Sequence, residues 1–201
     1  QIENCANSVV FQIREGGGKV SYIGGIVGNI IAESSKPLEI RGNIENRQTA
    51  DVLNQDSMVV FGGFIGYARN VILTSTNSSS GVANSVDKLN FSSSGAQSFV
   101  GGVIGVVEGT VTINNSAKTS SIMTSGDIRV TGGKMVMVAK IVGYVGTNSV
   151  LNLYANSNNS SNPFNGGNIY AHATNSKTCY VGELFNRHKT AVVNDNTGIK
   201  F

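Results

Sequence analysis

Apolar and polar positions along the chain recur in blocks, and each block contains one short glycine-rich phrase. The phrase reads apolar, Gly, Gly, apolar, apolar, Gly in three copies, and two further copies keep it loosely. The five copies span residues 23–28, 61–66, 100–105, 138–143 and 181–186. Successive copies begin 38, 39, 38 and 43 residues apart. Self-similarity at such a period predicts a repeat protein in which each unit buries its apolar face against its neighbours.

Alternation of β-branched residues and glycines predicts that the phrase is a strand. One face of this strand holds only apolar residues and glycine, so we expect it to form the interior. Its members are Tyr22, Gly24, Ile26, Gly28 and Ile30; Val60, Gly62, Phe64, Gly66 and Ala68; Phe99, Gly101, Val103, Gly105 and Val107; and Met137, Ala139, Ile141, Gly143 and Val145.

The other face of the phrase strand has a variable central site between apolar neighbours. Lys140 and Glu183 stand at that site in the last two copies, and a charge is costly to bury. A strand that is apolar on both faces is usually covered on both sides, so either a second layer of the chain or another molecule packs here. The candidate assembly face consists of Ile23, Val27, Phe61, Ile65, Val100, Ile104, Val138 and Val142.

Two further strands are expected in each unit, which gives three strands per unit. The second strand lies at residues 38–40, 71–73, 111–113, 151–153 and 191–193, and the third at 126–130 and 167–171, with weaker counterparts at 52–53 and 86–89. This layout predicts an all-β fold, a parallel β-helix or β-solenoid of about five repeats. The alternative is a five-bladed β-propeller, whose blades need four strands each. Residues 45–54 are the one segment expected to form a short helix.

The whole chain, residues 1–201, is therefore expected to be a single repeat array. The repeat cores lie near residues 22–30, 60–68, 99–107, 137–145 and 180–188. The chain lacks an initiator Met and begins within what looks like a partial repeat, so we interpret it as a piece of a longer protein.

Composition narrows the range of partners. With 15 Lys and Arg against 12 Asp and Glu, the net charge is +3 and no basic run occurs, which disfavours a nucleic-acid surface. Charged residues make up 13% of the chain, about half the usual share, and Asn, Ser, Thr and Gly fill the polar positions instead. Apolar runs fall well short of the roughly 20 residues that a membrane-spanning helix needs. Such a surface is typical of secreted repeat proteins.

The two cysteines, Cys5 and Cys179, lie near opposite ends of the chain. In a linear stack about four units would separate them, beyond the roughly 7 Å reach of a disulfide. We expect no bond between them. Two semi-buried thiols, or pairing with a missing segment or a neighbouring chain, remain as interpretations.

No arrangement of reactive residues predicts catalysis, a cofactor or a metal. His172 and His188 are sixteen residues apart without other ligands at suitable spacing. No Gly-x-Ser-x-Gly elbow occurs, and the glycine phrase lacks the Lys-Ser/Thr ending of a phosphate loop. Stacking could align Asp51, Asp87 and Asp127 into a row of carboxylates of the kind that cleaves polysaccharides. Repeated solvent-facing turns would produce the same spacing, so we expect a chain that is not an enzyme.

Low-complexity Asn- and Ser-rich segments separate the strands and contain acceptor sequences for N-glycosylation. The candidate sites are Asn77, Asn90, Asn114, Asn158 and Asn159. Their use depends on a eukaryotic secretory origin.

The phrase, followed by a short strand and an Asn/Ser-rich stretch, resembles the GLUG-type glycine-rich repeats of large secreted and surface proteins. Such repeats occur in bacterial adhesins and in long repeat proteins of protists. The chain departs from that pattern by its longer period and by Lys140, Glu183 and Asn186 at glycine positions. The resemblance implies an extracellular stalk or an adhesive role.

The leading hypothesis is an extracellular structural repeat segment of a longer surface or filament-forming protein, acting in assembly or adhesion. Its expected partners are copies or neighbouring repeats of the same protein, without nucleic acid or a membrane span. A glycan-binding β-helix module is the first alternative, and a polysaccharide-cleaving β-helix enzyme is the second. Glycan binding would be favoured by an exposed row of aromatic rings, for which Tyr67, Tyr144, Tyr154 and Tyr170 are the candidates.

Overall fold

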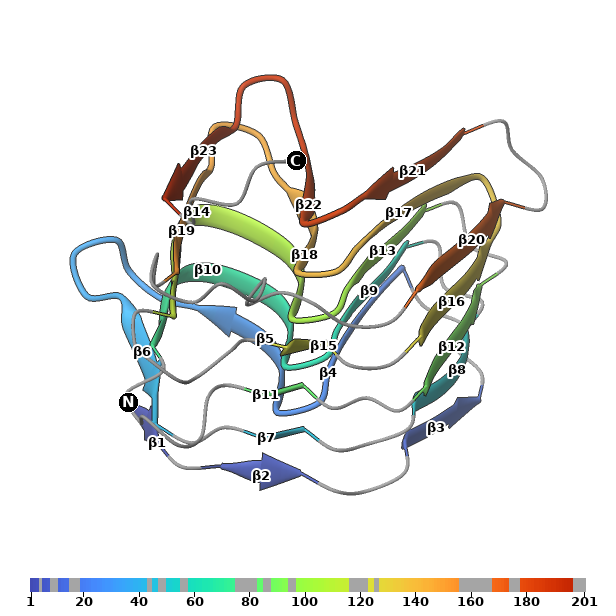
Figure 1. Ribbon diagram of the computed structural model, residues 1–201, viewed down its shortest axis with the longest axis horizontal. Coiled ribbons are helices and arrows are strands. Elements are labelled where there is room, and N and C mark those ends of the chain that lie inside the picture. The colour runs from blue at the N-terminus through green and yellow to red at the C-terminus, as the bar shows by residue number, and fades with distance from the viewer. Residues whose placement is uncertain are drawn as a thin grey trace.

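Parallel strands stack on one another to form a β-solenoid in the computed structural model of the chain (Figure 1). The structure describes residues 1–3, 5–7, 11–14, 19–42, 45–46, 50–54, 58–74, 83–84, 88–93, 97–115, 123–124, 127–155, 168–173 and 178–196. Within these residues every pairing between strands is parallel and no helix forms. The predicted all-β solenoid is confirmed, and the propeller is not favoured because its blades are antiparallel.

The described strands form four sheets. Sheet A has nine strands: β1 (Ile2–Glu3), β5 (Val27–Ile31), β6 (Leu38–Arg41), β10 (Ile65–Thr74), β14 (Ile104–Asn115), β18 (Val142–Val145), β19 (Val150–Ala155), β22 (Phe185–Arg187) and β23 (Val192–Asn196). Sheet B has four: β2 (Ala6–Asn7), β7 (Glu45–Asn46), β11 (Ala83–Asn84) and β15 (Met123–Thr124). Sheet C has five: β3 (Phe11–Arg14), β8 (Ala50–Asn54), β12 (Lys88–Ser93), β16 (Asp127–Gly132) and β20 (Ile169–Ala173). Sheet D has five: β4 (Val20–Gly24), β9 (Met58–Gly62), β13 (Gln97–Gly101), β17 (Met135–Ala139) and β21 (Thr178–Gly182).

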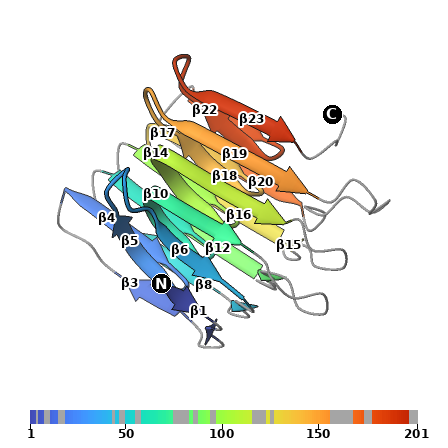
Figure 2. The same ribbon diagram turned by 90° about the vertical axis from the view of Figure 1, so that its left-hand side faces the viewer.

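The chain winds through sheets C, D and A and passes sheet B before the next circuit. We call each sheet D strand, with the sheet A strands that follow it, a rung; rungs 1 to 5 contain β4, β9, β13, β17 and β21 in turn. Figure 2 shows these strands stacked in chain order from the blue N-terminal end to the red C-terminal end. Each strand thus pairs with strands one circuit earlier and later in the sequence.

The glycine phrase is two strands joined by a sharp bend, so the prediction of one continuous strand was wrong. In rung 2, β9 ends at Gly62 in sheet D and β10 begins at Ile65 in sheet A (Figure 1). A Cβ atom on Gly62 would lie 1.8 Å from the carbonyl oxygen of Ile65, and one on Gly66 would lie 2.5 Å from that of Gly28 in rung 1. A side chain at Gly62 or Gly66 would overlap the neighbouring backbone, and glycine avoids this overlap.

Two clusters of buried apolar side chains fill the interior. The larger one belongs to sheet A and the bend: Ile30, Ile40, Phe64, Ile65, Ala68, Val71, Leu73, Val103, Ile104, Val107, Val111, Ile113, Ile141, Val142, Val145, Leu151, Leu153, Leu184 and Ala191. The second lies between sheets C and D: Ile23, Val59, Phe61, Phe91, Val100, Ile128, Val130, Val136 and Val138. Both clusters continue from rung to rung, so the core runs along the stack.

The candidate assembly face lies in these interior clusters and is not a free surface. Seven of its eight residues are buried, and Val27 packs partly buried against the larger cluster. The chain's own layers therefore cover this face, which was the first of the two alternatives. The bend explains the outcome, because it turns the two halves of the phrase toward different parts of the same interior.

The face predicted to be interior is divided by the same bend. Phe64 and Val103 are buried in the larger interior cluster, as expected. Val60 and Phe99 precede the bend and belong instead to a third cluster, separate from both interior ones. Side chains alternate between the two faces within each strand, but the alternation does not continue across the glycine bend. Residues before and after the bend therefore do not share one face.

The remaining predictions of local structure gave mixed results. Of the segment 45–54, residues 45–46 form β7 and residues 50–54 form β8 rather than a helix, because they pair in register with equivalent residues of other circuits. Strands occur at the predicted positions 38–40, 71–73, 111–113 and 151–153, although 71–73 and 111–113 are the second halves of the long strands β10 and β14. The described part of the chain contains no helix that could span a membrane.

Candidate functional site

A third group of apolar side chains, here called the outer cluster, lies between sheets D and A. Sheet D contributes Val60 and Phe99 together with Met58, Met135 and Met137, and sheet A contributes Tyr67, Val106 and Tyr144. Sheet D separates this cluster from the interior, because Val59 and Phe61 of β9 point inward while Val60 between them does not. Val60 and Tyr67 of this cluster lie on β9 and β10, two strands that Figure 1 shows diverging from the bend.

Each rung brings one aromatic ring to this region, and the rings alternate between the two sheets. They are Tyr22 on β4, Tyr67 on β10, Phe99 on β13, Tyr144 on β18 and Tyr180 on β21. Tyr22 and Tyr67 pack edge to face with ring centroids 5.3 Å apart, and Phe99 stacks on Tyr144 at 5.2 Å. Rungs 1 and 2 are thus paired through one ring contact, and rungs 3 and 4 through another.

The outer cluster includes a polar contact at its edge. The hydroxyl of Tyr67 donates a hydrogen bond to Oε2 of Glu108 at 2.5 Å. Burial, and then this hydrogen bond to a carboxylate, raise the pKa of Tyr67 well above its usual value. Burial also raises the pKa of Tyr144. Both phenols therefore remain protonated, and Tyr67 is held as a donor.

The corner where β10 and β14 change direction is stabilised by Asn70. This buried residue has a positive φ of 56°. Its Nδ2 donates to the carbonyl oxygen of Ala32 at 2.8 Å, and its Oδ1 accepts from the N–H of Thr110 at 3.0 Å. Gly109 and Asn148 also have positive φ, 61° and 54°. Asn70 thereby links three successive rungs at a corner where the backbone turns in the left-handed region.

An open pocket of about 540 Å³ lies beside this corner. It is lined by Ile31, Ala32, Glu33, Ser34, Arg69, Asn70, Gly109, Thr110 and Asn148. Glu33 and Arg69 are both exposed and bring opposite charges, so the lining is polar but electrically balanced. Such a pocket could take a small neutral polar molecule.

The last rung differs from the others at its sheet D strand. The Val181 side chain is 57% exposed, whereas Val138, its register partner in rung 4, is fully buried. Cys179 is likewise exposed, although its register partner Val136 is buried. Residues that face the interior in earlier rungs are therefore open to solvent here.

Sheet A of the last rung places charges in register with core residues. Arg187 pairs with Val145 and Asp195 pairs with Leu153, and both partners are fully buried. Arg187 and Asp195 themselves are exposed. Inward-pointing charges at the end of a sheet oppose the addition of another strand.

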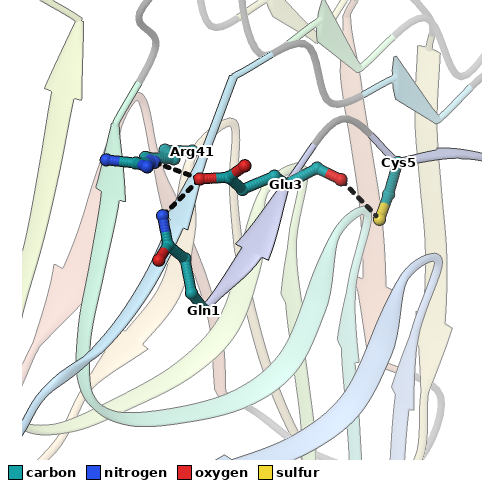
Figure 3. Close-up of polar contacts among 4 residues, drawn as sticks. All are labelled: Gln1, Glu3, Cys5 and Arg41. Atoms are coloured by element: carbon teal, nitrogen blue, oxygen red, sulfur yellow. Dashed lines mark hydrogen bonds and ion pairs between the residues drawn. The ribbon is translucent and has the colours of Figure 1, made fainter.

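A surface ion pair ties rung 1 to β1, the sheet A strand that precedes it in the chain. Arg41 Nε donates to Oε1 of Glu3, which joins β6 to β1, and Gln1 donates to the same oxygen (Figure 3). Both side chains of the ion pair are exposed, so it adds little stability. Cys5 Sγ donates to the carbonyl oxygen of Glu3 at 3.5 Å, and both Cys5 and Cys179 are free thiols.

The row of carboxylates that stacking could have aligned does not form among the residues that the structure describes. Asp127 pairs in register with Lys88, whereas Asp51 pairs with Asn90, which pairs in turn with Arg129. The two acids are thus two residues out of register, because the period of sheet C differs from the spacing of these residues. Asp87 lies outside the described residues.

The two histidines lie in different parts of the last circuit, His172 on β20 and His188 directly after β22. His172 is exposed on β20, and His188 Nδ1 lies 2.9 Å from the hydroxyl oxygen of Thr190. Where the structure describes side chains, it brings together no group of three or more His, Cys, Asp or Glu residues suited to a metal ion.

The five candidate N-glycosylation sites differ in how much of their surroundings the structure describes. Asn77, Asn158 and Asn159 lie outside the described residues. Asn90 lies on β12, where only its backbone is described. Asn114 lies near the end of β14 and is partly buried, with its Oδ1 buried and without a hydrogen-bond partner among the described groups.

The four tyrosines proposed as an aromatic row separate into different surfaces. Tyr67 and Tyr144 join the outer cluster, whereas Tyr154 lies on β19 and Tyr170 on β20. The Tyr170 ring packs under the Arg129 guanidinium at 4.1 Å. The row that does form also uses Tyr22, Phe99 and Tyr180, which the sequence analysis assigned to the interior or did not single out. Their shared position two residues before the first glycine of the phrase was the available signal.

Comparison with protein-family models, with curated proteins and with solved structures returned no match for this chain. The function is therefore argued from the geometry of the outer cluster, the corner pocket and the last rung. Of these, the last rung departs most clearly from the regular pattern that the other rungs share.

Proposed function

We propose that this chain is a structural repeat segment of a longer surface or filament-forming protein, and that it acts in assembly or adhesion rather than in catalysis. The observation that carries the proposal is the exposed inner-register residue Val181 at the end of a stack whose other members of the same ladder are buried. Each rung gains stability by covering its neighbour, so an uncovered rung is a surface that favours contact with a further one.

The free energy gained by burying the exposed apolar residues of the last rung favours such a contact. Fully burying a valine side chain is worth roughly 1.5 to 3 kcal/mol, so covering the exposed half of Val181 would contribute about 1 kcal/mol. Tyr180 beside it is 47% exposed and adds a larger apolar surface. A further strand beside β21, the last strand of sheet D, would add backbone hydrogen bonds as well.

An extracellular setting is part of the proposal and is supported by the surface chemistry. Only 13% of the chain is charged. On sheet A, Asn152 Nδ2 donates to Thr112 Oγ1 at 3.2 Å, and Asn194 Nδ2 donates to Asn152 Oδ1 at 2.8 Å. Neutral amide and hydroxyl groups thus form the side-chain links between three rungs on this face, where charged pairs would be an alternative.

The decisive experiment measures the size of the purified full chain over a range of concentrations. Light scattering coupled to gel filtration would report mass, and negative-stain electron microscopy would report shape. We expect particles that lengthen in one direction as concentration rises. A compact monomer at every concentration would contradict an assembly role. Intact mass before and after enzymatic deglycosylation tests the extracellular setting in the same samples.

Glycan binding is the second candidate, favoured by the alternating rings of the outer cluster. Tyr22 and Tyr180, the first and last rings of this alternating series, are 37% and 47% exposed and could stack on sugar rings. A glycan array probed with the wild-type chain and with Tyr180→Ala would test this candidate. Binding that is unchanged by Tyr180→Ala, or no binding at all, would remove its support.

A further inference from the structure

We propose that the corner pocket of sheet A binds a neutral saccharide, whose hydroxyl groups are held by Arg69 on the floor of the pocket and by Glu33 and Asn148 on its two walls. The pocket lies in rungs 1 to 4 and shares no residue with the last rung, so it would bind sugar with or without assembly. It also shares no residue with the outer cluster, and is therefore a separate site from the aromatic rings.

The pocket arises because the corner differs in length from rung to rung. Rung 1 places six residues, 32–37, between β5 and β6, and rung 4 places four, 146–149, between β18 and β19. Rungs 2 and 3 lack such a segment, since β10 and β14 run through the corner without a break. Figure 1 shows the connection between β5 and β6 as a blue loop that extends beyond the stack. Rungs 1 and 4 thus supply two walls, and rungs 2 and 3 supply a recessed floor between them.

The floor is held in shape by Asn70. Its buried side chain donates to the carbonyl oxygen of Ala32 in the rung 1 wall and accepts from the N–H of Thr110 in rung 3. Asn70, Gly109 and Asn148 have positive φ in three successive rungs, so the backbone turns in the same way along the corner. Because hydrogen bonds already join the wall to the floor, a ligand would find the pocket formed and would lose little affinity in ordering it.

The polar side chains of the lining are accessible to a ligand. Those that are exposed are Glu33, Ser34, Arg69, Thr110 and Asn148. Within the part of the chain that the structure describes, the Arg69 guanidinium forms no ion pair with a carboxylate. Glu108, its register partner on β14, instead accepts a hydrogen bond from the Tyr67 hydroxyl. The N–H donors of Arg69 are therefore open to a ligand in the pocket.

The mixture of groups favours a polyhydroxylated ligand without net charge. A guanidinium donates two parallel hydrogen bonds and a carboxylate accepts two, so each can hold neighbouring hydroxyls of one sugar ring. Ser34, Thr110 and Asn148 add neutral donors and acceptors. A small zwitterion would satisfy the two charges alone and leave these three groups unused.

The size and the one large apolar member of the lining also suit a saccharide. The volume of about 540 Å³ falls within the range of about 300 to 1,000 Å³ that is usual for small-molecule sites. Ile31 is 65% exposed at the edge of the pocket. Its side chain offers an apolar surface to the C–H face of a sugar ring, whose hydroxyls would point toward the floor and the walls.

A titration followed by NMR tests the site directly. The isotopically labelled chain is titrated with neutral trisaccharides of glucose, galactose, mannose and N-acetylglucosamine, and with free glycine as the zwitterion. We expect at least one trisaccharide to cause saturable shifts of the Gly109 and Asn148 amide resonances, and glycine to cause none. Absence of saturable shifts at both residues with every trisaccharide would overturn the proposal. A response to glycine stronger than to every trisaccharide would overturn the choice of ligand.

Arg69→Ala should weaken binding of the responding trisaccharide about tenfold or more, because charge-assisted hydrogen bonds are lost. Lys36→Ala is the matched control, since Lys36 is an exposed cation of the same corner outside the lining. Glu33→Gln should weaken binding less than Glu33→Ala does, because the amide keeps an acceptor oxygen. Equal affinities of Arg69→Ala and Lys36→Ala would refute the role of the guanidinium.

Filling the pocket gives an independent test. Ser34→Trp places a large side chain in the lining, whereas Ser35→Trp places it on the neighbouring exposed residue outside the lining. We expect Ser34→Trp to abolish sugar binding and Ser35→Trp to retain it, with circular dichroism showing both variants folded. Equal binding by the two variants would show that the sugar lies elsewhere.

The corner site and the proposed assembly fail separately. Assemblies that bind none of the trisaccharides would refute the corner site alone, whereas monomers that bind one through Arg69 would refute assembly alone. Binding that is lost in Tyr180→Ala and kept in Arg69→Ala would assign the sugar to the aromatic rings and overturn the corner site.

Discussion

Tyr67 and Glu108 are joined by a hydrogen bond of 2.5 Å that connects rung 2 to rung 3 at the edge of the outer cluster. The phenol is almost completely buried, and the carboxylate is partly buried. The Glu108 carboxylate thus lies against an apolar cluster, and removing the Tyr67 hydroxyl would leave it without this donor. The loss would lower the stability of the fold.

The stability of the fold should decline in alkaline solution because of this contact. The pKa of Tyr67 is raised in the folded state above its ordinary value of 10.0, so the unfolded chain releases this proton first as pH rises. The stabilisation is therefore complete below about pH 10 and is lost progressively above it. Urea unfolding at pH 7, 9 and 10.5 measures the decline.

Tyr67→Phe should lower the free energy of unfolding at pH 7 by about 1 to 3 kcal/mol, because Glu108 loses its donor. The same change should make the alkaline decline shallower. Tyr154→Phe, at an exposed position on β19, should alter neither quantity. Identical alkaline slopes for the wild type and Tyr67→Phe would contradict the assignment.

Asn70 should contribute through its side-chain hydrogen bonds and through its backbone conformation, and two substitutions separate these effects. Asn70→Gly keeps the positive φ without strain but loses both bonds, with an expected loss of about 2 kcal/mol. Asn70→Ala should lose about 1 to 2 kcal/mol more, because alanine is strained at this φ. Thermal or urea unfolding gives both values.

Asn148→Gly is the matched control for Asn70→Gly. Asn148 has nearly the same φ but is exposed, and it contacts Thr190 through its backbone N–H, which glycine retains. We expect its stability to remain within about 0.5 kcal/mol of the wild type. An Asn70→Gly variant as stable as Asn148→Gly would show that the two bonds across rungs contribute nothing.

Two adjacent glycines of the third phrase, Gly101 and Gly102, should respond in opposite ways to substitution. A Cβ on Gly101 would lie 1.9 Å from the carbonyl oxygen of Ile104, so Gly101→Val should cost about 3 kcal/mol or prevent folding. Gly102→Lys should be tolerated within about 1 kcal/mol, because Lys140 occupies the equivalent bend position of rung 4. Circular dichroism and urea unfolding report both outcomes; similar losses for the two variants would contradict the close-approach explanation.

Ser98 should be replaceable with a gain in stability. Its side chain is fully buried, its Oγ has no hydrogen-bond partner among the described groups, and its register partners are Val59 and Val136. Ser98→Ala removes the unsatisfied hydroxyl and should raise the free energy of unfolding by about 1 kcal/mol. Ser35→Ala, at an exposed site, should have no effect. A destabilised Ser98→Ala variant would indicate that the hydroxyl is bonded.

The repeat period and the strand positions could be predicted from the sequence, because residues one period apart in a solenoid pair with each other in the same sheet. Gly62 and Gly101 differ by one period and pair directly in sheet D. The sharp bend could not be predicted from the alternation of residues. Glycine fits equally well within a straight strand and at a bend where two backbone segments approach closely. Residues 45–54 were expected to form a short helix, yet residues 50–54 pair with a strand on each side in sheet C, and this pairing imposes the extended form there.

The charges of the last rung and the rings of the outer cluster were harder to predict, because their positions depend on the strand register and on the bend. The repeat pattern did not single out Arg187 or Asp195, because the last phrase follows at 43 residues rather than 38 or 39. Only the strand register places them beneath Val145 and Leu153. Tyr22 and Phe99 were assigned to the interior because the phrase was treated as one strand, whereas the bend places them outside it.

The alternation of aromatic rings gives the molecule a longer structural period than its sequence shows. Tyr22 pairs with Tyr67 and Phe99 with Tyr144, so side-chain packing repeats over two rungs while the glycine phrase repeats over one. Inserting or deleting a single rung would put rings of neighbouring rungs on the same sheet and break this pairing. Changes of two rungs would preserve it, so this stack should tolerate changes in length by even numbers of rungs far better than by odd ones.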